Sequence, residues 1–380
     1  MRIAFVSHDS EAGGAERAML ELIDGLRERG VTCLVLLRKR GWLERELNRR
    51  GVSCAVIPYR GWSSARLRTR LLNLLALVMV LPVVIQLRRW KVDVVLTNTS
   101  VIPVGALAAL ALRRPHIWHI HEFCWKEYGS TFDLGDCLSI KAIGWLSDFV
   151  IANSKAVEAY YAGFIPPQRI RMIYQGVNVQ VPGATGEASK PVGRVEPVKL
   201  VLVGAIQEGK GQTDAVQAVG WLKSQGVRPE LTLVGTGEPA DLEKVKRTVS
   251  DCDLERLVNF TGQVADPGPI VEDSDIALSC SRSEAFGRST VEAMKLGKPV
   301  IGARGGATPE LVREGFNGLL YAPGDYLDLA QKIKLLIDNP GLAKQMGENG
   351  CRWAQEEFTV AKYAGRVLQV LKEAVHETEA

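Results

Sequence analysis

The residue types best suited to chemistry lie between Ser283 and Glu292, where Glu284 and Glu292 are separated by seven residues. The pattern between them predicts a loop that runs into a helix start, with Gly287 allowing a ligand to approach the backbone closely. The first turn of a helix has unpaired N–H groups and partial positive charge, so it binds phosphate without a metal. Carboxylates accept hydrogen bonds from hydroxyl groups. The stretch therefore predicts a site for a ligand that joins sugar hydroxyls to a diphosphate, as a nucleotide sugar does.

A purely structural interpretation of the same stretch stays open. Ser289 followed three residues later by Glu292 fits a capping box, in which the carboxylate binds the backbone amide at the start of the helix. The two roles are compatible with each other.

Lys210 is the cation that the sequence places nearest to such a site. It follows a predicted strand, Lys199–Gly204, and precedes a helix expected to begin near Gln212, so its ammonium group would reach a phosphate above the sheet. A solvated surface lysine in a turn is the structural alternative. Glycines after two further strands, in 235–237 and 262–264, are weaker candidates for nucleotide contact because glycine is common in turns.

Gly13 and Gly14 follow the first predicted strand and precede a helix expected over 15–28. Flexible amides at a helix start are suited to an anion, although a plain strand-to-helix turn explains them as well.

The segment from His116 to Glu122 concentrates the histidines of the first half. His119 and His121 share one face if the segment is extended, and Glu122 and Cys124 follow closely. A metal site is an alternative here, but the sequence has no second Cys/His pair at zinc-like spacing. We expect no metal and no cofactor beyond the sugar-carrying nucleotide itself.

Short β-branched runs alternate with helical stretches along the whole chain, which predicts parallel sheets covered by helices. The predicted strands are Ile3–Ser7, Cys33–Leu37, Cys54–Ile57, Val92–Thr97, His116–His119, Phe149–Ala152, Lys199–Gly204, Glu230–Val234, Val258–Thr261, Ile276–Ser279 and Pro299–Ala303. A length of 380 residues favours two domains. We expect two doubly wound, Rossmann-like α/β domains that face an interdomain cleft, because ligands of such sheets bind beyond the carboxyl ends of the strands. The expected boundaries are a first domain over 1–182, a linker rich in Gly, Pro and Ser over 183–197, a second domain over 198–356, and a final segment over 357–380.

Together these motifs resemble the retaining glycosyltransferases of the GT4 type, whose EX7E signature matches Glu284 to Glu292. The resemblance covers nearly the whole chain and implies the GT-B fold, with a last helix that crosses back to the first domain. It implies that 198–356 is the nucleotide-sugar-binding domain and that 1–182 is the acceptor-side domain. It implies transfer of a hexose-type sugar from a nucleoside diphosphate sugar to a glycan, glycolipid or small-molecule acceptor. It also implies retention of the anomeric configuration without a covalent enzyme intermediate, so that catalysis rests on positioning and on stabilising the diphosphate.

The resemblance also assigns roles. Glu284 would bind the transferred sugar, Glu292 the ribose, and Lys210 the leaving diphosphate, while His121 would position the sugar. With His121, Glu284 and Lys210 as the catalytic set, the donor would contact these residues: Gly13, Gly14, Gly204, Lys210, Gly237, Glu284, Phe286, Gly287, Arg288, Ser289, Thr290 and Glu292. Relatives carry an arginine where this chain has Ala205, and Arg288 or Arg304 would have to compensate. Ser154, Tyr174 and Gly176 are weaker candidates for the lining of the site.

The net charge of +4 conceals an asymmetry, since residues 1–180 carry 24 Lys and Arg against 15 Asp and Glu. Much of this excess flanks the apolar stretch 71–85, between Arg66 and Lys91. The stretch is shorter than the ~20 residues that span a bilayer, so it is either a buried helix or a segment that lies on an anionic membrane surface. Nucleic acid is disfavoured as a partner because the basic residues lack interleaved aromatics.

The sequence favours a cytoplasmic protein, with a possible peripheral position on the inner face of the membrane. Its seven cysteines have no paired spacing, and its first predicted strand begins at once.

Two alternative functions stay open. A non-catalytic sugar-binding or nucleotide-sugar-binding protein of two domains would not need Glu284, Glu292 and Lys210 together, and a Rossmann-type oxidoreductase would need a GxGxxG fingerprint that residues 7–14 do not supply.

Overall fold

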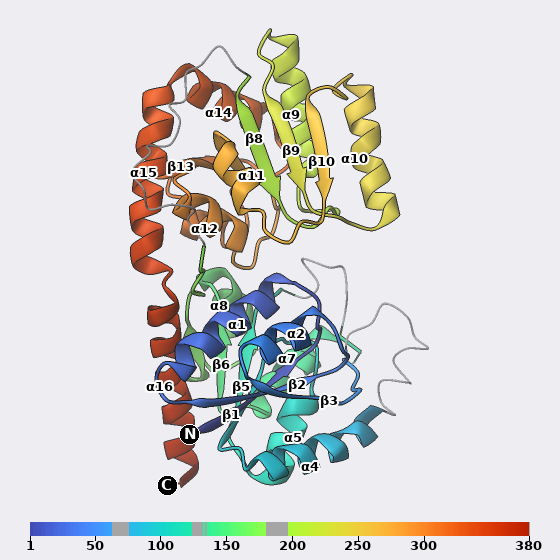
Figure 1. The fold of residues 1–380 in the computed structure, drawn as a ribbon, viewed down its shortest axis with the longest axis vertical. Coiled ribbons are helices and arrows are strands. Elements are labelled where there is room, and N and C mark those ends of the chain that lie inside the picture. The colour runs from blue at the N-terminus through green and yellow to red at the C-terminus, as the bar shows by residue number, and fades with distance from the viewer. Residues whose placement is uncertain (63–75, 124–131, 134, 180–196, 380) are drawn as a thin grey trace. The chain divides into compact units, whose positions relative to one another are not determined.

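The computed structural model describes residues 1–62, 76–123, 132–133, 135–179 and 197–379 (Figure 1). The chain forms two compact units. The first unit combines Met1–Gly176 with Thr359–Ala380, and the second is Val177–Phe358. The chain thus changes unit a few residues away from the expected boundaries at 182 and 356, and almost all of the expected linker lies outside the described residues.

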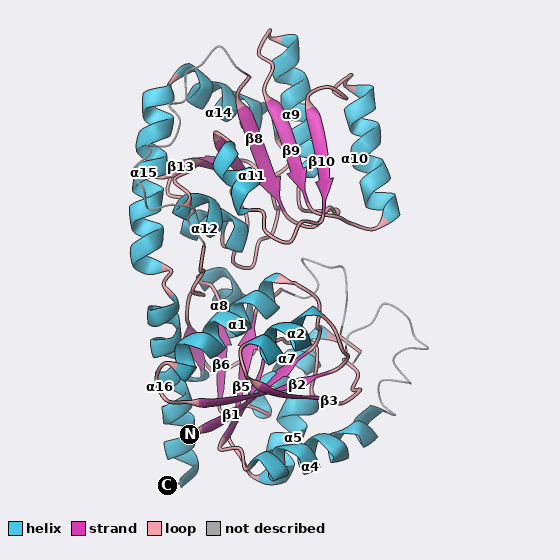
Figure 2. Cartoon of the chain, in the orientation of Figure 1, coloured by secondary structure: helices cyan, strands magenta, loops and turns pink. Residues whose placement is uncertain are grey.

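The first unit is built on a seven-stranded sheet in the order β3-β2-β1-β4-β5-β6-β7, with every neighbouring pair parallel (Figure 2). The strands are β1 (Arg2–Ser7), β2 (Thr32–Leu37), β3 (Ser53–Val56), β4 (Val94–Thr97), β5 (His116–Ile120), β6 (Phe149–Ala152) and β7 (Ile170–Met172). Residues from Ile3 to Val6 are fully buried. Their continuous apolar run is typical of a parallel strand that is covered on both faces.

Helices cover this sheet: α1 (Gly14–Arg27), α2 (Trp42–Arg49), α4 (Val80–Trp90), α5 (Val104–Leu112), α7 (Asp136–Trp145), α8 (Lys155–Ala162) and α16 (Val360–Glu379). The short 3-10 turns are η1 (Ala76–Met79) and η2 (Pro167–Arg169). Helix α16 packs against α1 and buries Tyr363, Val367 and Leu371 in the same core. The final segment of the chain therefore belongs to the first unit, which is where the GT-B resemblance places the last helix.

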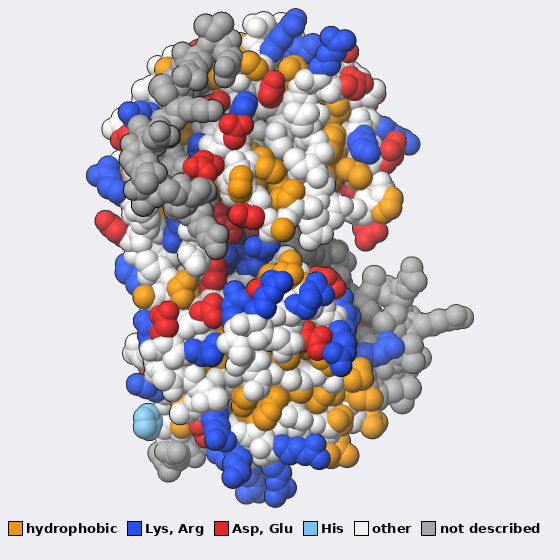
Figure 3. Space-filling model, viewed as in Figure 1, with side chains coloured by type: hydrophobic (Ala, Val, Ile, Leu, Met, Phe, Trp, Pro, Cys, Tyr) orange, Lys and Arg blue, Asp and Glu red, His pale blue; other side chains and the backbone are white. Residues whose placement is uncertain are grey.

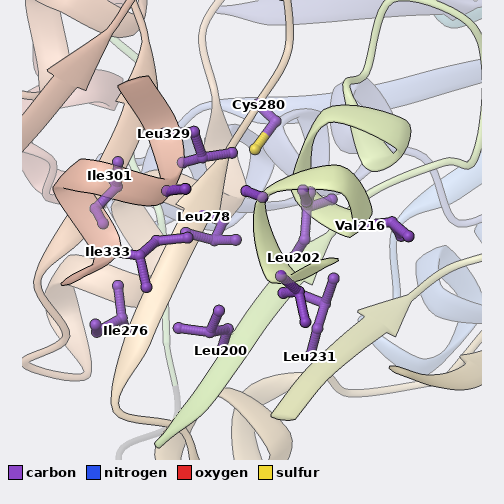
Figure 4. Close-up of a cluster of buried hydrophobic side chains, with 14 of the residues drawn as sticks. Leu200, Leu202, Val216, Leu231, Ile276, Leu278, Cys280, Ile301, Leu329 and Ile333 are labelled. Atoms are coloured by element: carbon purple, nitrogen blue, oxygen red, sulfur yellow. The ribbon is translucent and has the colours of Figure 1, made fainter. Parts of the chain in front are cut away.

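The second unit has a six-stranded parallel sheet in the order β10-β9-β8-β11-β12-β13. Its strands are β8 (Lys199–Val203), β9 (Glu230–Val234), β10 (Val258–Gly262), β11 (Ile276–Ser279), β12 (Val300–Ala303) and β13 (Gly318–Tyr321). Its helices are α9 (Gln212–Ser224), α10 (Pro239–Asp251), α11 (Gly268–Asp273), α12 (Arg288–Lys295), α13 (Thr308–Leu311), α14 (Tyr326–Asp338) and α15 (Pro340–Glu357). Apolar side chains from β8, β11, α9 and α14 meet in one core (Figure 4).

The expected α/β class and two-domain organisation are confirmed. The sequence analysis missed β7 and β13. Both are short, and β13 begins with a glycine, so neither has enough β-branched residues for a local pattern to reveal it.

Candidate active site

The loop that carries Glu284 joins β11 to α12 and is held from both sides by neighbouring loops. The amide of Arg282 donates to the carbonyl of Gly209 at 2.7 Å, and the amide of Ala307 donates to the carbonyl of Glu284 at 2.7 Å. Gly306 has φ +56, and a Cβ atom there would clash with the backbone of Glu284. The backbone of Glu284 is therefore held by close contacts, and a residue larger than glycine at position 306 would break them.

Lys210 reaches the same place from the loop between β8 and α9. Its Nζ lies 3.0 Å from Oε2 of Glu284, and about one fifth of each side chain is exposed, 19% and 20%. Strands β8 and β11 are neighbours in the sheet, so the loops after their carboxyl ends meet at one edge. The structure thus brings together the two residues that the sequence analysis chose from separate loops.

Helix α12 begins at Arg288, and its N-cap is Gly287, at φ 97 and without a side-chain cap. The capping-box hypothesis is wrong, because Ser289 lies inside the helix rather than at its N-cap. Glu292 instead faces Arg288 across one helical turn at 3.5 Å. The carboxylate of Glu292 therefore lies one turn beyond the start of α12, and the first turn itself has no acidic residue.

Other candidates for the donor site lie in α12 or in the loops beside it. The hydroxyl of Thr290 donates to Ser279 at 3.0 Å and Phe286 is buried, so both help to hold the loop in place. Ser289 is half-buried. Arg304 lies 3.5 Å from Glu314, so its charge is directed to that carboxylate.

The glycines after β8 and β9 allow three loops to pack backbone to backbone. The amide of Gly204 donates to Val234, and the amide of Gly235 donates to Gly262. A Cβ atom on Gly237 would clash with the carbonyl of Ile206. Close approach between loops therefore explains Gly235 and Gly237, whereas a Cβ atom on Gly204 would meet open space. Ala205 is exposed.

In the first unit, Gly13 is the N-cap of α1 and Gly14 its first residue. The sequence analysis missed Glu16, a buried carboxylate in the first turn, which lies where a Cβ atom of Gly13 would be. Burial raises the pKa of Glu16. Its position three residues after the N-cap glycine is a signal that could have found it.

Glu122 fixes the backbone at the end of β5. Its Oε1 accepts hydrogen bonds from the Thr99 hydroxyl at 2.7 Å and from the Ser100 amide at 2.6 Å and hydroxyl at 2.7 Å. Its Oε2 accepts from the amide of His121 at 3.0 Å. The buried carboxylate thus ties the loop after β4 to the residue that follows β5.

The ring of His121 is bound on both sides by amide side chains. Its Nε2 lies 2.9 Å from Oδ1 of Asn98, and its Nδ1 lies 2.5 Å from Nε2 of Gln175. The sequence analysis missed Asn98 and Gln175, because their distance along the chain gives no local signal.

His119 is fully buried, with its ring centroid 4.2 Å from that of His121. Burial lowers the pKa of His119 to about 3. Within the described parts of the chain, no group of three or more His, Cys, Asp or Glu is placed to hold a metal ion. Cys124, the other proposed ligand, lies outside the described residues.

The weaker candidates of the first unit have structural roles. The hydroxyl of Ser154 caps α8 by accepting from the amide of Val157 at 3.1 Å. A Cβ atom on Gly176 would meet the backbone of Thr359 and Val360, so close packing explains this glycine.

Two family models together match most of the chain. The model described as Glycosyltransferase Family 4 matches residues 12–181, and the model described as Glycosyl transferases group 1 matches residues 187–353. An uncharacterized glycosyltransferase of Methanocaldococcus jannaschii is 43% identical over 71% of this chain and 72% of its own.

The chain belongs to the GT4-type glycosyltransferases. It is therefore an enzyme that transfers a sugar from a nucleotide-activated donor, and the oxidoreductase hypothesis is wrong. A second relative, the lipopolysaccharide core biosynthesis glycosyltransferase LpsE of Rhizobium meliloti, is 26% identical over 96% of this chain and 97% of its own. Among solved structures, HepE of Anabaena in complex with UDP-glucose has a TM-score of 0.81 and 25% identity, and covers 98% of this chain and 100% of its own. The fold is GT-B.

Proposed function

We propose that this glycosyltransferase binds a nucleoside diphosphate sugar at the loops after β8 and β11 and transfers its hexose with retention of configuration. The observation that supports this most strongly is the contact between Lys210 and Glu284 beside the N-terminus of α12. An ammonium group, the N-terminal end of a helix and an accessible carboxylate are together complementary to a diphosphate joined to a polyhydroxyl ring.

In the proposed reaction the bond between the anomeric carbon and the diphosphate oxygen breaks, while the acceptor oxygen bonds to the same face of the sugar. The acceptor's proton goes to an oxygen of the leaving diphosphate. Lys210 and the first turn of α12 would stabilise the negative charge that develops there. Glu284 would hold sugar hydroxyls, Glu292 would hold ribose hydroxyls, and His121 would position the transferred ring.

A panel of UDP-, GDP- and ADP-sugars tests donor binding by thermal stabilisation. A ligand at 100 times its dissociation constant adds about 2.7 kcal/mol to the free energy of unfolding, which is readily measured as a shift in Tm. We place UDP-sugars first because the structural relative HepE binds UDP-glucose. The anomeric configuration of the product, read by NMR, tests retention, and an inverted product would refute the mechanism.

We further propose that the acceptor is a glycan or a lipid-linked sugar, reached at an anionic membrane surface. Exposed apolar side chains on α4, on α5 and just before α4 support the membrane part of this proposal. The two helices pack together and expose Leu81 (63%), Ile85 (44%) and Leu110 (64%), and Val78 (74%) is exposed on the turn η1 directly before α4. Large apolar side chains gathered on neighbouring helices are typical of an interaction surface.

Basic side chains border this apolar surface. Arg88, Arg89 and Lys91 lie at the end of α4, and Arg113 follows α5; all four are exposed. Neither helix contains an acidic residue. Figure 3 shows hydrophobic and basic side chains together over the part of the first unit that α4 and α5 occupy. Arg66, Arg68 and Arg70 lie outside the described residues.

This combination fits a lipid surface, since each basic residue near an anionic headgroup layer contributes about 1 kcal/mol and each buried methylene about 0.8 kcal/mol. Within the described parts of the chain, no helix has the length and apolar character needed to cross a bilayer.

Vesicle co-sedimentation tests the membrane proposal. We expect the protein to sediment at low salt with vesicles that contain phosphatidylglycerol, to be released at high salt, and to lose binding in Leu81→Asp. The matched control is Leu335→Asp, at an exposed leucine of α14 in the other unit. If wild-type protein does not sediment at low salt, or if both variants lose binding equally, the membrane proposal is wrong.

A further inference from the structure

The hydrogen bonds around His121 determine which of its ring nitrogens carries a proton. Nδ2 of Asn98 donates to the carbonyl of Ala15 at 3.1 Å, and a carbonyl can only accept. This fixes the orientation of the Asn98 amide, so the atom that faces His121 is the acceptor Oδ1. His121 must therefore donate to it, and Nε2 carries the hydrogen.

The second ring nitrogen of His121, Nδ1, faces a hydrogen-bond donor instead of an acceptor. The atom facing Nδ1 is Nε2 of Gln175, an amide nitrogen that donates and cannot accept. Gln175 is buried, with 3% of its surface exposed. Nδ1 must accept this hydrogen bond, so it carries no proton and the imidazole is neutral.

We propose that Asn98 and Gln175 are positioning residues that hold His121 as the neutral Nε2–H tautomer for sugar transfer. This inference rests on the proposed function, in which positive charge develops on the sugar ring as the diphosphate leaves. A neutral imidazole beside that ring avoids the repulsion that an imidazolium would exert, and a fixed ring costs no reorganisation during the reaction.

Elements from across the first unit hold the ring in place. Asn98 follows β4, His121 follows β5, Gln175 follows β7, and Ala15 lies in the first turn of α1. The Glu122 carboxylate also accepts the backbone amide of His121. Side chains supported by several rigid elements keep their geometry better than side chains of a single loop.

Neutral partners are a requirement of this arrangement. A carboxylate at either amide position would attract a second proton to the ring, because an opposite charge nearby favours the charged form. The proposal therefore distinguishes Gln175 from Glu at the same position, although the two side chains have nearly the same shape.

Long-range 1H–15N NMR of protein labelled at histidine tests the tautomer directly. The chain has five histidines, so the spectrum is simple, and the His121→Asn variant assigns the resonances of interest. At pH 7.5 and without substrate, we expect the Nε2–H pattern in the wild type and two protonated nitrogens in Gln175→Glu. Gln175→Leu should keep the Nε2–H pattern, because Asn98 still accepts from Nε2.

Kinetics test the consequence for transfer. We expect both Gln175 variants to lower kcat by about 10–100-fold while the donor KM changes by less than about two-fold, since misplacement of a catalytic group by 1 Å has effects of this size. Gln369→Leu, at an exposed glutamine of α16 in the same unit, is the matched control and should leave kcat and the His121 spectrum unchanged.

An Nδ1–H or doubly protonated His121 in the wild type would overturn the proposal. So would a Gln175→Leu variant with wild-type kcat, or a Gln175→Glu variant in which His121 carries a single ring proton. Because the spectra are recorded without substrate, failure of the donor panel would refute the proposed function while leaving the tautomer assignment to be decided by NMR. The wild-type spectrum decides that assignment even if a variant does not fold.

Discussion

Breaking the ion pair between Lys210 and Glu284 is a sharp test of the proposed donor site. The two charged atoms are 3.0 Å apart and each side chain is about one-fifth exposed, at 19% and 20%. Hydrogen bonds to charged groups contribute about 1.5–3 kcal/mol. If the ammonium group holds the donor diphosphate, Lys210→Met should weaken binding of the nucleoside diphosphate by this amount, or roughly 10–150-fold in Kd.

Glu284→Gln should act in the opposite direction on binding. The amide keeps the shape of the side chain but no longer shares the charge of Lys210, so the ammonium group can interact more strongly with a phosphate. We expect the nucleoside diphosphate to bind as tightly as in the wild type or more tightly, while kcat falls by about 10²–10³-fold because a group that acts on the sugar is lost.

The assay is a double-mutant cycle. Isothermal titration with the nucleoside diphosphate and initial rates of sugar transfer are measured for the wild type, both single variants and the double variant. The control is Lys244→Met, which removes an exposed ion pair to Glu208, with Lys244 58% and Glu208 81% exposed. Such pairs contribute about 0–1 kcal/mol, so the control should bind and react normally.

Two results would refute the reasoning. Lys210→Met could bind the nucleoside diphosphate with wild-type affinity, which would show that the ammonium group does not contact the diphosphate. Glu284→Gln could weaken binding as much as Lys210→Met does, which would show that the pair serves only to hold the loop together.

Three further predictions concern other parts of the chain. Burial lowers the pKa of His119 to about 3, so as the pH falls from 6.5 the unfolded chain takes up a proton that the folded chain does not. The free energy of unfolding should fall by about 1.6 kcal/mol between pH 6.5 and pH 5 through this residue, and urea unfolding should show a smaller loss in His119→Gln; equal losses would contradict the assignment. Glu292→Ala should weaken nucleoside diphosphate binding by about 1.5–3 kcal/mol in the same titrations, and wild-type affinity would remove Glu292 from the site. Gly306→Ala should lower the transfer rate and destabilise the fold by about 1–3 kcal/mol or more, because it combines a positive φ with a clash against Glu284. Gly315→Ala, which has a positive φ but open space around the new Cβ atom, should cost less, and equal costs would show that the clash is unimportant.

Most of the fold could be predicted from the sequence because parallel strands buried on both faces form short, continuous apolar runs. Strands β6, β9 and β11 have the bounds that the sequence analysis gave them. Strand β7 was missed because its three residues carry no recognisable period.

The candidate site was partly predictable for a related reason. Lys210 was chosen because it follows a predicted strand, and Glu284 was chosen because it lies in a loop predicted to run into a helix start, with Glu292 seven residues further on. The capping box at Ser289 was wrong because the sequence cannot say which residue of 287–289 takes the N-cap position, and here the helix begins directly after Gly287.

The sequence by itself determined the class of fold, the order of strands and helices along the chain, and the loops that carry charge, because these depend on local patterns of residue type. Only the tertiary structure decided which loops meet. Lys210 and Glu284 are 74 residues apart, and Asn98, His121 and Gln175 form one hydrogen-bonded group only because β4, β5, β6 and β7 lie in that order in the sheet. The order of strands across a sheet is set by the packing of the whole unit, and hydrogen-bond partners follow from it, so no local pattern in the sequence encodes them.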